Sequence, residues 1–271
     1  MAASNTTQSA SVAPTASTSA PIDRLTQDQR DALARIGSAT VSSQLSKLGI
    51  RDAHLTGLGQ LTDGEAIAGT ALTLKFMPKR EDLYRVDEYA DPEVQLHRHV
   101  LYAVEPGDVV VVDGRSDMSS GLFGEMMLTY LVGKGGAGLV VDGCVRDWPS
   151  VRELGLPIWA RGTTPNFHTQ TGLMPFDFNC PIACGDCTVI PGDAIVADAD
   201  GAVVVPAGLV DQVIERSASH HDWEEFSRLR LRAGGDMRRY YPLSDAARPE
   251  YEEWARAHGN AESAGSKRDR A

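Results

Sequence analysis

Two short segments carry side chains whose types and spacing suit anion binding and acid–base chemistry. The segment 119–125 is rich in Ser and Gly and ends in Glu125. The segment 142–147 follows an apolar run and ends in Arg146 and Asp147. Arginine can hold a carboxylate through two parallel hydrogen bonds, and aspartate can bind a hard divalent cation. Neither segment contains lysine, so Schiff-base chemistry is not favoured.

Each segment also has a simpler interpretation. The glycines of 119–125 suit a tight turn, although they would also let a carboxylate or phosphate reach the free N–H groups of a following helix. Arg146 and Asp147 suit a surface ion pair, and Asp147 suits a helix cap ahead of Trp148. Spacing alone leaves both interpretations open.

The elements around these segments indicate an α/β fold with a partly parallel sheet. The runs Val109–Val112 and Leu139–Val141 are short and wholly apolar, which is typical of strands covered on both faces. Helices are predicted over Glu125–Gly133 and Trp148–Leu154, and a strand over Pro157–Trp159. Strands and helices that alternate in this way place the ends of the strands at one edge, where binding loops gather.

Further elements are predicted on both sides of this middle region. Before it, we predict a helix 27–36 capped by Thr26, a helix bearing Val41, Leu45 and Leu48 that stops at Gly49, a strand within 64–77, and a helix starting at Asp91-Pro92-Glu93. After it, we predict an antiparallel hairpin over 194–205 and helices over 207–217 and 222–232. A docked helix bearing Tyr251 and Trp254 follows.

Composition divides the chain into three parts. Residues 1–22 are Ser, Thr, Ala and Pro with few large apolar side chains, so we expect them to be disordered. Residues 23–235 form the expected catalytic domain. Residues 236–271 form an expected C-terminal helical extension with a loose tail.

The charge balance and hydropathy exclude several classes of function. The chain has 271 residues and a net charge of -11, with no basic block, so it should repel nucleic-acid backbones. No apolar run approaches the roughly 20 residues that span a bilayer. No secretory signal is recognisable, because Arg24 is the first basic residue and no apolar core precedes it. We therefore expect a cytoplasmic protein that binds neither nucleic acid nor membrane.

The four cysteines include a C-x3-C-x2-C pattern made by Cys180, Cys184 and Cys187. This spacing is used by enzymes that hold an iron–sulfur cluster, but a cluster needs a further ligand or cofactor, and the chain after it is too short for the barrel that normally follows. We expect small buried thiols instead.

The spacing of the acidic residues and the arginine resembles that of the RraA-like family. Twenty residues separate Glu125 from Arg146-Asp147, which is similar to the acid-x20-Arg-Asp signature of that family. The family includes the class II 4-hydroxy-4-methyl-2-oxoglutarate (4-carboxy-4-hydroxy-2-oxoadipate) aldolases. The segments 136–147 and 157–162 are also similar, as are 191–193 together with 197–201, and the resemblance extends from Ile36 to Ser219.

The resemblance implies a compact layered α/β sandwich of the swivelling β/β/α type, assembled as a homotrimer or homohexamer with sites between subunits. It implies that Arg146 binds the carboxylate and carbonyl of a pyruvyl group. The backbone N–H groups of Met126 and Met127, with Gly124 beside them, would share that carboxylate. Asp147 would hold Mg²⁺ or Mn²⁺, mostly through water.

For Glu125 the resemblance implies a proton-carrying water, although the family more often has Asp at this position. The expected activity is a metal-dependent retro-aldol cleavage that gives pyruvate, with oxaloacetate decarboxylation through the same enolate. Alternatives are a lyase or hydratase acting on a sugar-derived 2-oxo acid, and a non-enzymatic regulator of ribonuclease E. His168 is a further candidate acid or base, against the simpler interpretation of an ordinary loop histidine.

Overall fold

The computed structural model describes residues 21–80, 82–83, 93 and 95–265. The chain divides into two compact units, and the boundary in sequence lies between Asp211 and Gln212. The expected disordered segment 1–22 lies outside the described residues except for its last two, of which Ile22 packs against the core. The expected helix start at Asp91 also lies outside the described residues.

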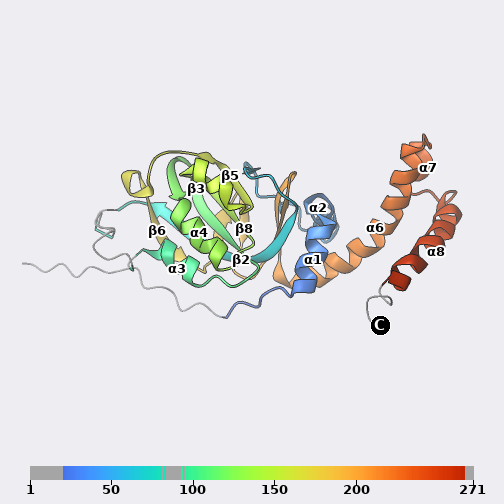
Figure 1. Ribbon diagram of the computed structural model, residues 1–271, viewed down its shortest axis with the longest axis horizontal. Helices are drawn as coiled ribbons and strands as arrows, with labels where there is room; N and C mark the ends of the chain where they lie inside the picture. The colour runs from blue at the N-terminus through green and yellow to red at the C-terminus, as the bar shows by residue number, and fades with distance from the viewer. Residues whose placement is uncertain (1–20, 81, 84–92, 94, 266–271) are drawn as a thin grey trace, which may run out of the picture. The chain divides into compact units, whose positions relative to one another are not determined.

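A mixed sheet forms the centre of the first unit (Figure 1). Its strands are β1 (Gly59–Gln60), β2 (Ile67–Pro78), β3 (Asp108–Phe123), β4 (Gly138–Val145), β5 (Ile158–Thr163), β6 (Leu173–Phe178), β9 (Ala194–Asp198) and β10 (Gly201–Val205). The order is β1-β5-β4-β3-β2-β9-β10, and β6 pairs with β2. The strands β2 to β5 run parallel, while the other pairs are antiparallel.

Helices and a small hairpin cover this sheet. The helices of the first unit are α1 (Gln27–Ile36), α2 (Ser38–Lys47), α3 (Leu96–Tyr102), α4 (Glu125–Gly133) and α5 (Trp148–Val151), and the hairpin is β7 (Ile182–Cys184) with β8 (Cys187–Val189). Figure 1 shows α3 and α4 in front of the strands. The result is a layered α/β architecture, as expected.

The two faces of the sheet carry separate apolar clusters. Val110 and Val112 of β3 belong to a cluster that includes side chains of α3 and α4. Val109 and Val111 belong to a second cluster with the β7–β8 hairpin. Successive side chains of a strand point to opposite faces, so a strand buried on both faces must be apolar throughout. The prediction of a doubly covered strand at Val109–Val112 is confirmed.

Several local predictions are also confirmed. The Thr26 side chain accepts the N–H of Gln29 at the start of α1, and the Gln29 side chain accepts the N–H of Thr26 in return. This reciprocal pair satisfies two donors at the helix end. The predicted hairpin forms from β9 and β10, which pair in antiparallel register.

The predicted loops 119–125 and 142–147 are largely strand. β3 continues to Phe123, and β4 continues to Val145. Their pairing slips between Val112 and Asp117 and then resumes, so β3 bulges away from β4 and returns to it. Ser and Gly argue locally against a strand, but the hydrogen bonds available beside β4 override that preference.

The helices predicted at 207–217 and 222–232 are wrong as two elements, because one continuous helix α6 (Val210–Arg232) spans most of both. No Gly or Pro lies between Ser217 and Asp222 to stop it. The start of the helix also differs from the prediction, because residues 207–209 form a 3-10 turn and α6 begins at Val210.

The second unit contains most of α6, together with α7 (Met237–Tyr240) and α8 (Arg248–Gly265). Phe226 of α6 is fully buried, and its ring contacts Tyr240, Tyr251 and Trp254 at centroid distances of 5.8–5.9 Å. The docked helix predicted from Tyr251 and Trp254 is confirmed. In the described part of the chain, no helix combines the length and apolar character needed to cross a membrane.

Candidate active site

The carboxyl ends of β3 and β4 lie side by side and bring the two segments together. Phe123 and Val145 are register partners, and the N–H of Arg146 donates to the carbonyl of Phe123 at 2.9 Å. Glu125 begins α4 beside this point, and Arg146 and Asp147 lead into α5. Residues separated in sequence by all of α4 and β4 therefore share one edge of the sheet.

Asp147 is held in one geometry by contacts on two sides. Its backbone is left-handed, with φ 58°, a conformation that aspartate tolerates better than most residues. Its carbonyl accepts the N–H groups of Ser150 and Val151, both at 3.0 Å. Its carboxylate does not cap α5; instead Oδ2 accepts the N–H of Glu125 at 3.3 Å. The alternative interpretation, in which the Asp147 side chain caps the following helix, is therefore wrong.

Gly124 lets the two helix starts approach each other this closely. A Cβ atom at Gly124 would lie 2.4 Å from Oδ2 of Asp147 and 3.0 Å from Nε of Arg146. The backbone at Gly124 is extended, with φ -126°, so conformation alone does not require glycine. The requirement is for space, because any side chain would displace the carboxylate or the guanidinium.

Packing against Gly121 and Phe167, and not a short ion pair, holds the Arg146 side chain. Its stem passes Gly121, where an added Cβ would lie 2.7 Å from Cβ of Arg146. Its Cζ lies 4.8 Å from the centre of the Phe167 ring. Nη1 is 3.7 Å from Oδ1 of Asp147, which is longer than a hydrogen bond, and the side chain is 32% exposed. The guanidinium therefore has donors to offer to an anion.

The start of α4 supplies further donors. The first-turn N–H groups of a helix lack intrahelical acceptors, and the helix dipole favours negative charge there. The N–H of Glu125 bonds to Asp147, and those of Met126 and Met127 follow it in the same turn. The Glu125 side chain is half-exposed, and Met126 is 76% exposed. The Arg146 guanidinium lies beside Gly124, so it is a neighbour of this first turn, and such an arrangement suits a carboxylate.

The same residues fit a hard cation bound through one carboxylate. Among residues 21–80, 82–83, 93 and 95–265, no three His, Cys, Asp or Glu side chains are grouped so as to hold a metal ion. The Asp147 carboxylate is 40% exposed, and its Oδ1 lies 3.7 Å from Nη1 of Arg146. Mg²⁺ often keeps several waters and takes one or two carboxylates. Asp147 fits such a water-rich site.

His168, the further candidate acid or base, packs among aromatic rings. It is buried, and its ring contacts Phe167 at 4.7 Å and His97 at 4.8 Å. Burial, followed by the charges of Lys79 and Arg146, lowers the pKa of His168 to about 4. The imidazole is therefore neutral near pH 7 and acts as an aromatic packing group.

Sequence reasoning missed Phe167 as part of the site, and it did not single out Gly121 within the segment 119–125. Phe167 lies in a loop, where no periodic pattern marks it, and Gly121 matters only because Arg146 packs on it. Both roles arise from contacts between segments far apart in sequence, so the spacing gave no signal for either.

Two of the four cysteines lie in the small hairpin that covers one face of the sheet. Cys184 and Cys187 are register partners in the β7–β8 hairpin, and both are buried. Burial raises the pKa of the Cys184 thiol, and the neighbouring carboxylates raise it further. Cys144 is also buried, whereas Cys180 is half-buried. Three of the four thiols are thus buried, as expected.

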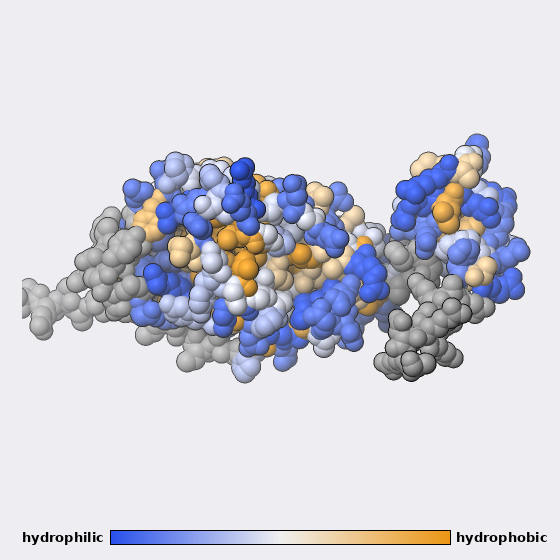
Figure 2. Space-filling model, in the orientation of Figure 1, coloured by the Kyte–Doolittle hydropathy of each residue, from blue (hydrophilic) through white to orange (hydrophobic). Residues whose placement is uncertain are grey.

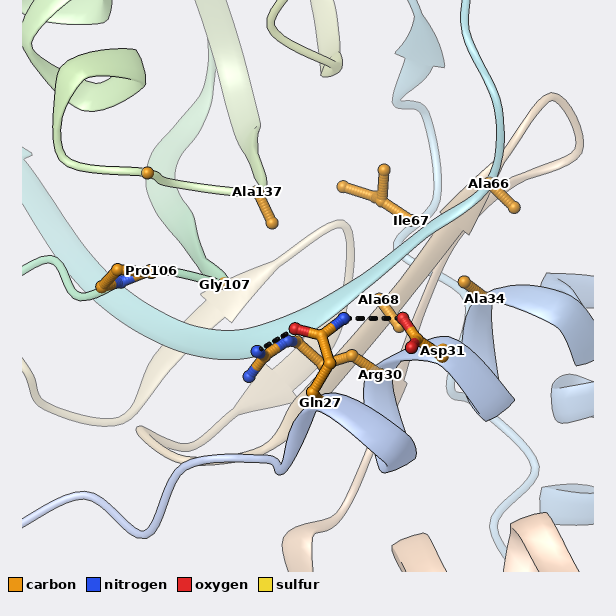
Figure 3. A pocket seen from close by; sticks show the side chains of 11 residues that line it. Gln27, Arg30, Asp31, Ala34, Ala66, Ile67, Ala68, Pro106, Gly107 and Ala137 are labelled. Carbon is orange, nitrogen blue, oxygen red and sulfur yellow. Dashed lines mark hydrogen bonds between the residues drawn. The ribbon is translucent and has the colours of Figure 1, made fainter. Parts of the chain in front are cut away.

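A hollow of about 410 Å³ lies at the amino ends of the parallel strands (Figure 3). Its charged rim is paired internally, because Gln27 accepts from Arg30 and donates to Asp31, both at 2.7 Å. The remaining lining is mainly Ala, Gly, Pro and Ile. It lies at the opposite ends of the strands from Arg146, and ligands of α/β sheets gather at the carboxyl ends.

Comparison with known proteins identifies relatives of this chain. A family model described as RraA-like, Aldolase/RraA, matches residues 38–204. A Halalkalibacterium halodurans protein named "Putative 4-hydroxy-4-methyl-2-oxoglutarate aldolase" is 39% identical over 117 residues, which are 43% of this chain and 55% of that protein. Protein DlpA of Legionella pneumophila is 23% identical over 76% of this chain and 32% of its own length. The matches thus span about half or less of these two relatives.

Solved structures share the fold. Streptomyces coelicolor RraAS2, described as an unusual member of the RNase ES inhibitor RraA protein family, has a TM-score of 0.70 and 43% identity. That likeness covers 78% of this chain and 100% of RraAS2. An uncharacterised Pseudomonas syringae protein has a TM-score of 0.67 at 24% identity, over 82% of this chain and 99% of its own. The second likeness concerns the fold alone.

Proposed function

Because this chain belongs to the RraA-like family, we propose that it is a metal-dependent lyase that cleaves a 4-hydroxy-2-oxo acid and releases pyruvate. The observation that carries the proposal is the meeting of the Arg146 guanidinium, the Asp147 carboxylate and the start of α4 at one sheet edge. The name of the Halalkalibacterium halodurans relative supports an aldolase type of reaction.

The reaction breaks the C3–C4 bond of the substrate. The 4-hydroxyl group loses its proton as it becomes the carbonyl of the second product, and the electron pair of the broken bond moves onto C3 and the C2 carbonyl as an enolate. C3 then takes up a proton, which gives pyruvate. Negative charge therefore develops at the carbonyl oxygen, and fixed donors aimed at that oxygen stabilise the transition state.

Arg146 and the start of α4 provide these donors. In the proposal the planar guanidinium of Arg146 binds the substrate carboxylate and the adjacent carbonyl region. The N–H groups of Met126 and Met127 share the carboxylate, and Gly124 keeps this space open. Because these groups are already in place before binding, little reorganisation accompanies the development of charge.

Glu125 and Asp147 divide the remaining tasks. Glu125 is half-exposed at the first position of α4, so its carboxylate suits a water that carries the proton. Asp147 would hold Mg²⁺ or Mn²⁺ through its partly exposed carboxylate. When bound, such a cation supplies positive charge that stabilises the enolate. Decarboxylation of oxaloacetate passes through the same enolate, so we include it as an activity of the same site.

The proposal includes a homo-oligomer, a trimer or hexamer. The helix α4 is apolar on both sides, since Leu128 and Leu131 are buried while Tyr130 and Val132 are exposed together with Tyr102 of α3. Figure 2 shows orange and pale surface in the region where Figure 1 draws α4. An apolar helix face of this kind is typical of a protein–protein interface. Because α4 begins at the site, such an interface would lie beside it.

A direct assay tests the proposed function. The purified chain is incubated with Mg²⁺ and a panel containing 4-hydroxy-4-methyl-2-oxoglutarate, 4-carboxy-4-hydroxy-2-oxoadipate, oxaloacetate and sugar-derived 2-oxo acids, and pyruvate is measured by a coupled dehydrogenase. Turnover of a 4-hydroxy-2-oxo acid that disappears in Arg146→Lys supports the proposal. Absence of pyruvate from every substrate contradicts it.

A second candidate function is inhibition of a ribonuclease of the RNase E type. The likeness to RraAS2 over the whole of that chain favours it. The discriminating measurement is cleavage of a model RNA by RNase ES with and without this protein. Inhibition that persists in Arg146→Lys, together with no release of pyruvate, would make the regulator the better description.

A further inference from the structure

The contact between Arg146 and Phe167 has a specific geometry. Cζ of Arg146 lies 4.8 Å from the centre of the Phe167 ring, within the roughly 6 Å over which a cation and an aromatic face attract each other. The negative face of the ring interacts with the guanidinium as a whole. This contact does not use the N–H groups of the guanidinium as hydrogen-bond donors, whereas a carboxylate partner would accept hydrogen bonds from them. A contact with the face of the Phe167 ring can therefore hold Arg146 in place while its N–H groups remain available to a ligand.

Phe167 is itself held firmly. Its N–H donates to Oε1 of Gln170 and its carbonyl accepts the N–H of Gln170, both at 2.9 Å. The backbone of Phe167 also forms an isolated β-bridge with Gly121 of β3. The N–H of Gly121 donates to the carbonyl of Asn166, the residue before Phe167, at 3.0 Å. The edge of the buried His168 ring supports it, at a centroid distance of 4.7 Å. The ring is thus fixed relative to β3, the strand against which Arg146 packs.

We propose that Phe167 is a positioning residue, which orients the Arg146 guanidinium for the carboxylate of the substrate before binding. The inference rests on the proposed function, because it takes the ligand to be a planar 2-oxo acid. The stem of Arg146 passes close to Gly121 and Gly124, and its head lies over the Phe167 ring. The carboxylate must then approach in the plane of the guanidinium, which is the bidentate geometry.

The decisive variants replace the aromatic face with aliphatic bulk. In Phe167→Leu the guanidinium loses its stacking partner, so we expect the affinity for oxalate, a planar analogue of the pyruvate enolate, to fall roughly threefold to tenfold. Titration calorimetry with oxalate and Mg²⁺ measures this. Phe167→Tyr keeps the aromatic face and should restore the wild-type affinity. Phe176→Leu is the matched control, because Phe176 is an exposed phenylalanine of β6.

A second readout does not depend on ligand or turnover. The ¹⁵N order parameter of the Arg146 Nε–H group should fall in Phe167→Leu and stay high in Phe167→Tyr and Phe176→Leu. If the melting temperature of Phe167→Leu is lowered strongly, Phe167→Met provides the same test with a more flexible side chain.

The outcomes separate this inference from the function on which it rests. Unchanged oxalate affinity and unchanged Nε order in Phe167→Leu overturn the positioning role, even if the wild-type enzyme releases pyruvate. If the Nε order responds as expected while the wild-type protein binds no oxalate and cleaves no 2-oxo acid, Phe167 does orient Arg146 but the proposed substrate class is wrong.

Discussion

The N–H of Glu125 donates to Oδ2 of Asp147 across 3.3 Å, so a single carboxylate joins the start of α4 to the start of α5. Both helices begin at the carboxyl ends of paired parallel strands, β3 and β4. The residue between β3 and α4 is Gly124, which has no side chain to interrupt that bond. The geometry of the site therefore depends on where the backbone places the starts of α4 and α5.

Arg146→Lys should abolish most activity. A lysine retains the charge but not the planar fork that binds a carboxylate through two bonds. We expect a loss of about 2–4 kcal/mol in transition-state stabilisation, comparable to the removal of one oxyanion donor. The measurement is kcat/KM for the substrate found in the panel. Arg152→Lys, at an exposed arginine in the turn that follows α5, should behave as the wild type does. An unchanged kcat/KM in Arg146→Lys would assign Arg146 a structural role.

Asp147→Asn should lose metal binding without loss of fold. Asparagine tolerates the left-handed backbone and can still accept the N–H of Glu125, but it lacks the charge that a cation needs. We expect EDTA to abolish wild-type activity, added Mg²⁺ or Mn²⁺ to restore it, and Mn²⁺ binding measured by electron paramagnetic resonance to weaken at least roughly tenfold in the variant. Asp186→Asn, at another left-handed aspartate, is the matched control. Full activity after exhaustive EDTA treatment contradicts the role of the metal.

Gly124→Ala should lower activity because the added methyl group takes up space that Asp147 and Arg146 occupy. The added Cβ would lie 2.4 Å from Oδ2 of Asp147, so the carboxylate and the neighbouring Arg146 must move. We expect kcat/KM to fall by roughly a hundredfold, as for a small misplacement of catalytic groups. Gly133→Ala is the control at the other end of α4, where an added Cβ meets nothing within 4 Å. If both variants keep full activity, Gly124 has no special role.

The stability of the protein should fall between pH 6.5 and 4 because of His168. Burial, with the charges of Lys79 and Arg146, lowers its folded-state pKa to about 4, whereas the unfolded chain takes up a proton near pH 6.5. Between these values the unfolded state binds more protons, so acid favours unfolding. The contribution lost between pH 7.5 and 5 is about 2 kcal/mol.

Urea denaturation of the wild type and His168→Leu at the two pH values measures this effect. The variant should lose less stability on acidification, even if it is less stable at both. The pKa of His97 is also lowered, by burial first and then by the charge of His168, so some dependence on pH should remain. Equal slopes in the two proteins would show that His168 does not titrate in this window.

Tyr130→Glu should dissociate the proposed oligomer. The Tyr130 ring is exposed on α4 and lies edge-on to Tyr102 of α3 at 6.0 Å, so a charge there would be buried in the interface. Sedimentation velocity should show a smaller species than the wild type. Ser46→Glu places the same charge at an exposed position of α2 and should leave the mass unchanged. A wild-type protein that sediments as a monomer contradicts the proposal.

The sequence by itself determined the elements that depend on local patterns. A run of four valines requires a strand buried on both faces, and Thr26 with Gln29 requires a helix start, because these preferences act over a few residues. The resemblance of the segments around Glu125 and Arg146-Asp147 to the RraA-like signature selected these residues as a candidate site. Each falls where a strand ends and a helix begins, which short-range patterns mark well.

Only the tertiary structure decided how those residues meet. The bond between Asp147 and Glu125 and the contact of Arg146 with Phe167 both join segments distant in the chain. The pairing with β4 likewise turned an expected loop into the end of β3. Such contacts depend on where neighbouring strands stop and which backbone comes close, and no local preference of one residue contains that information.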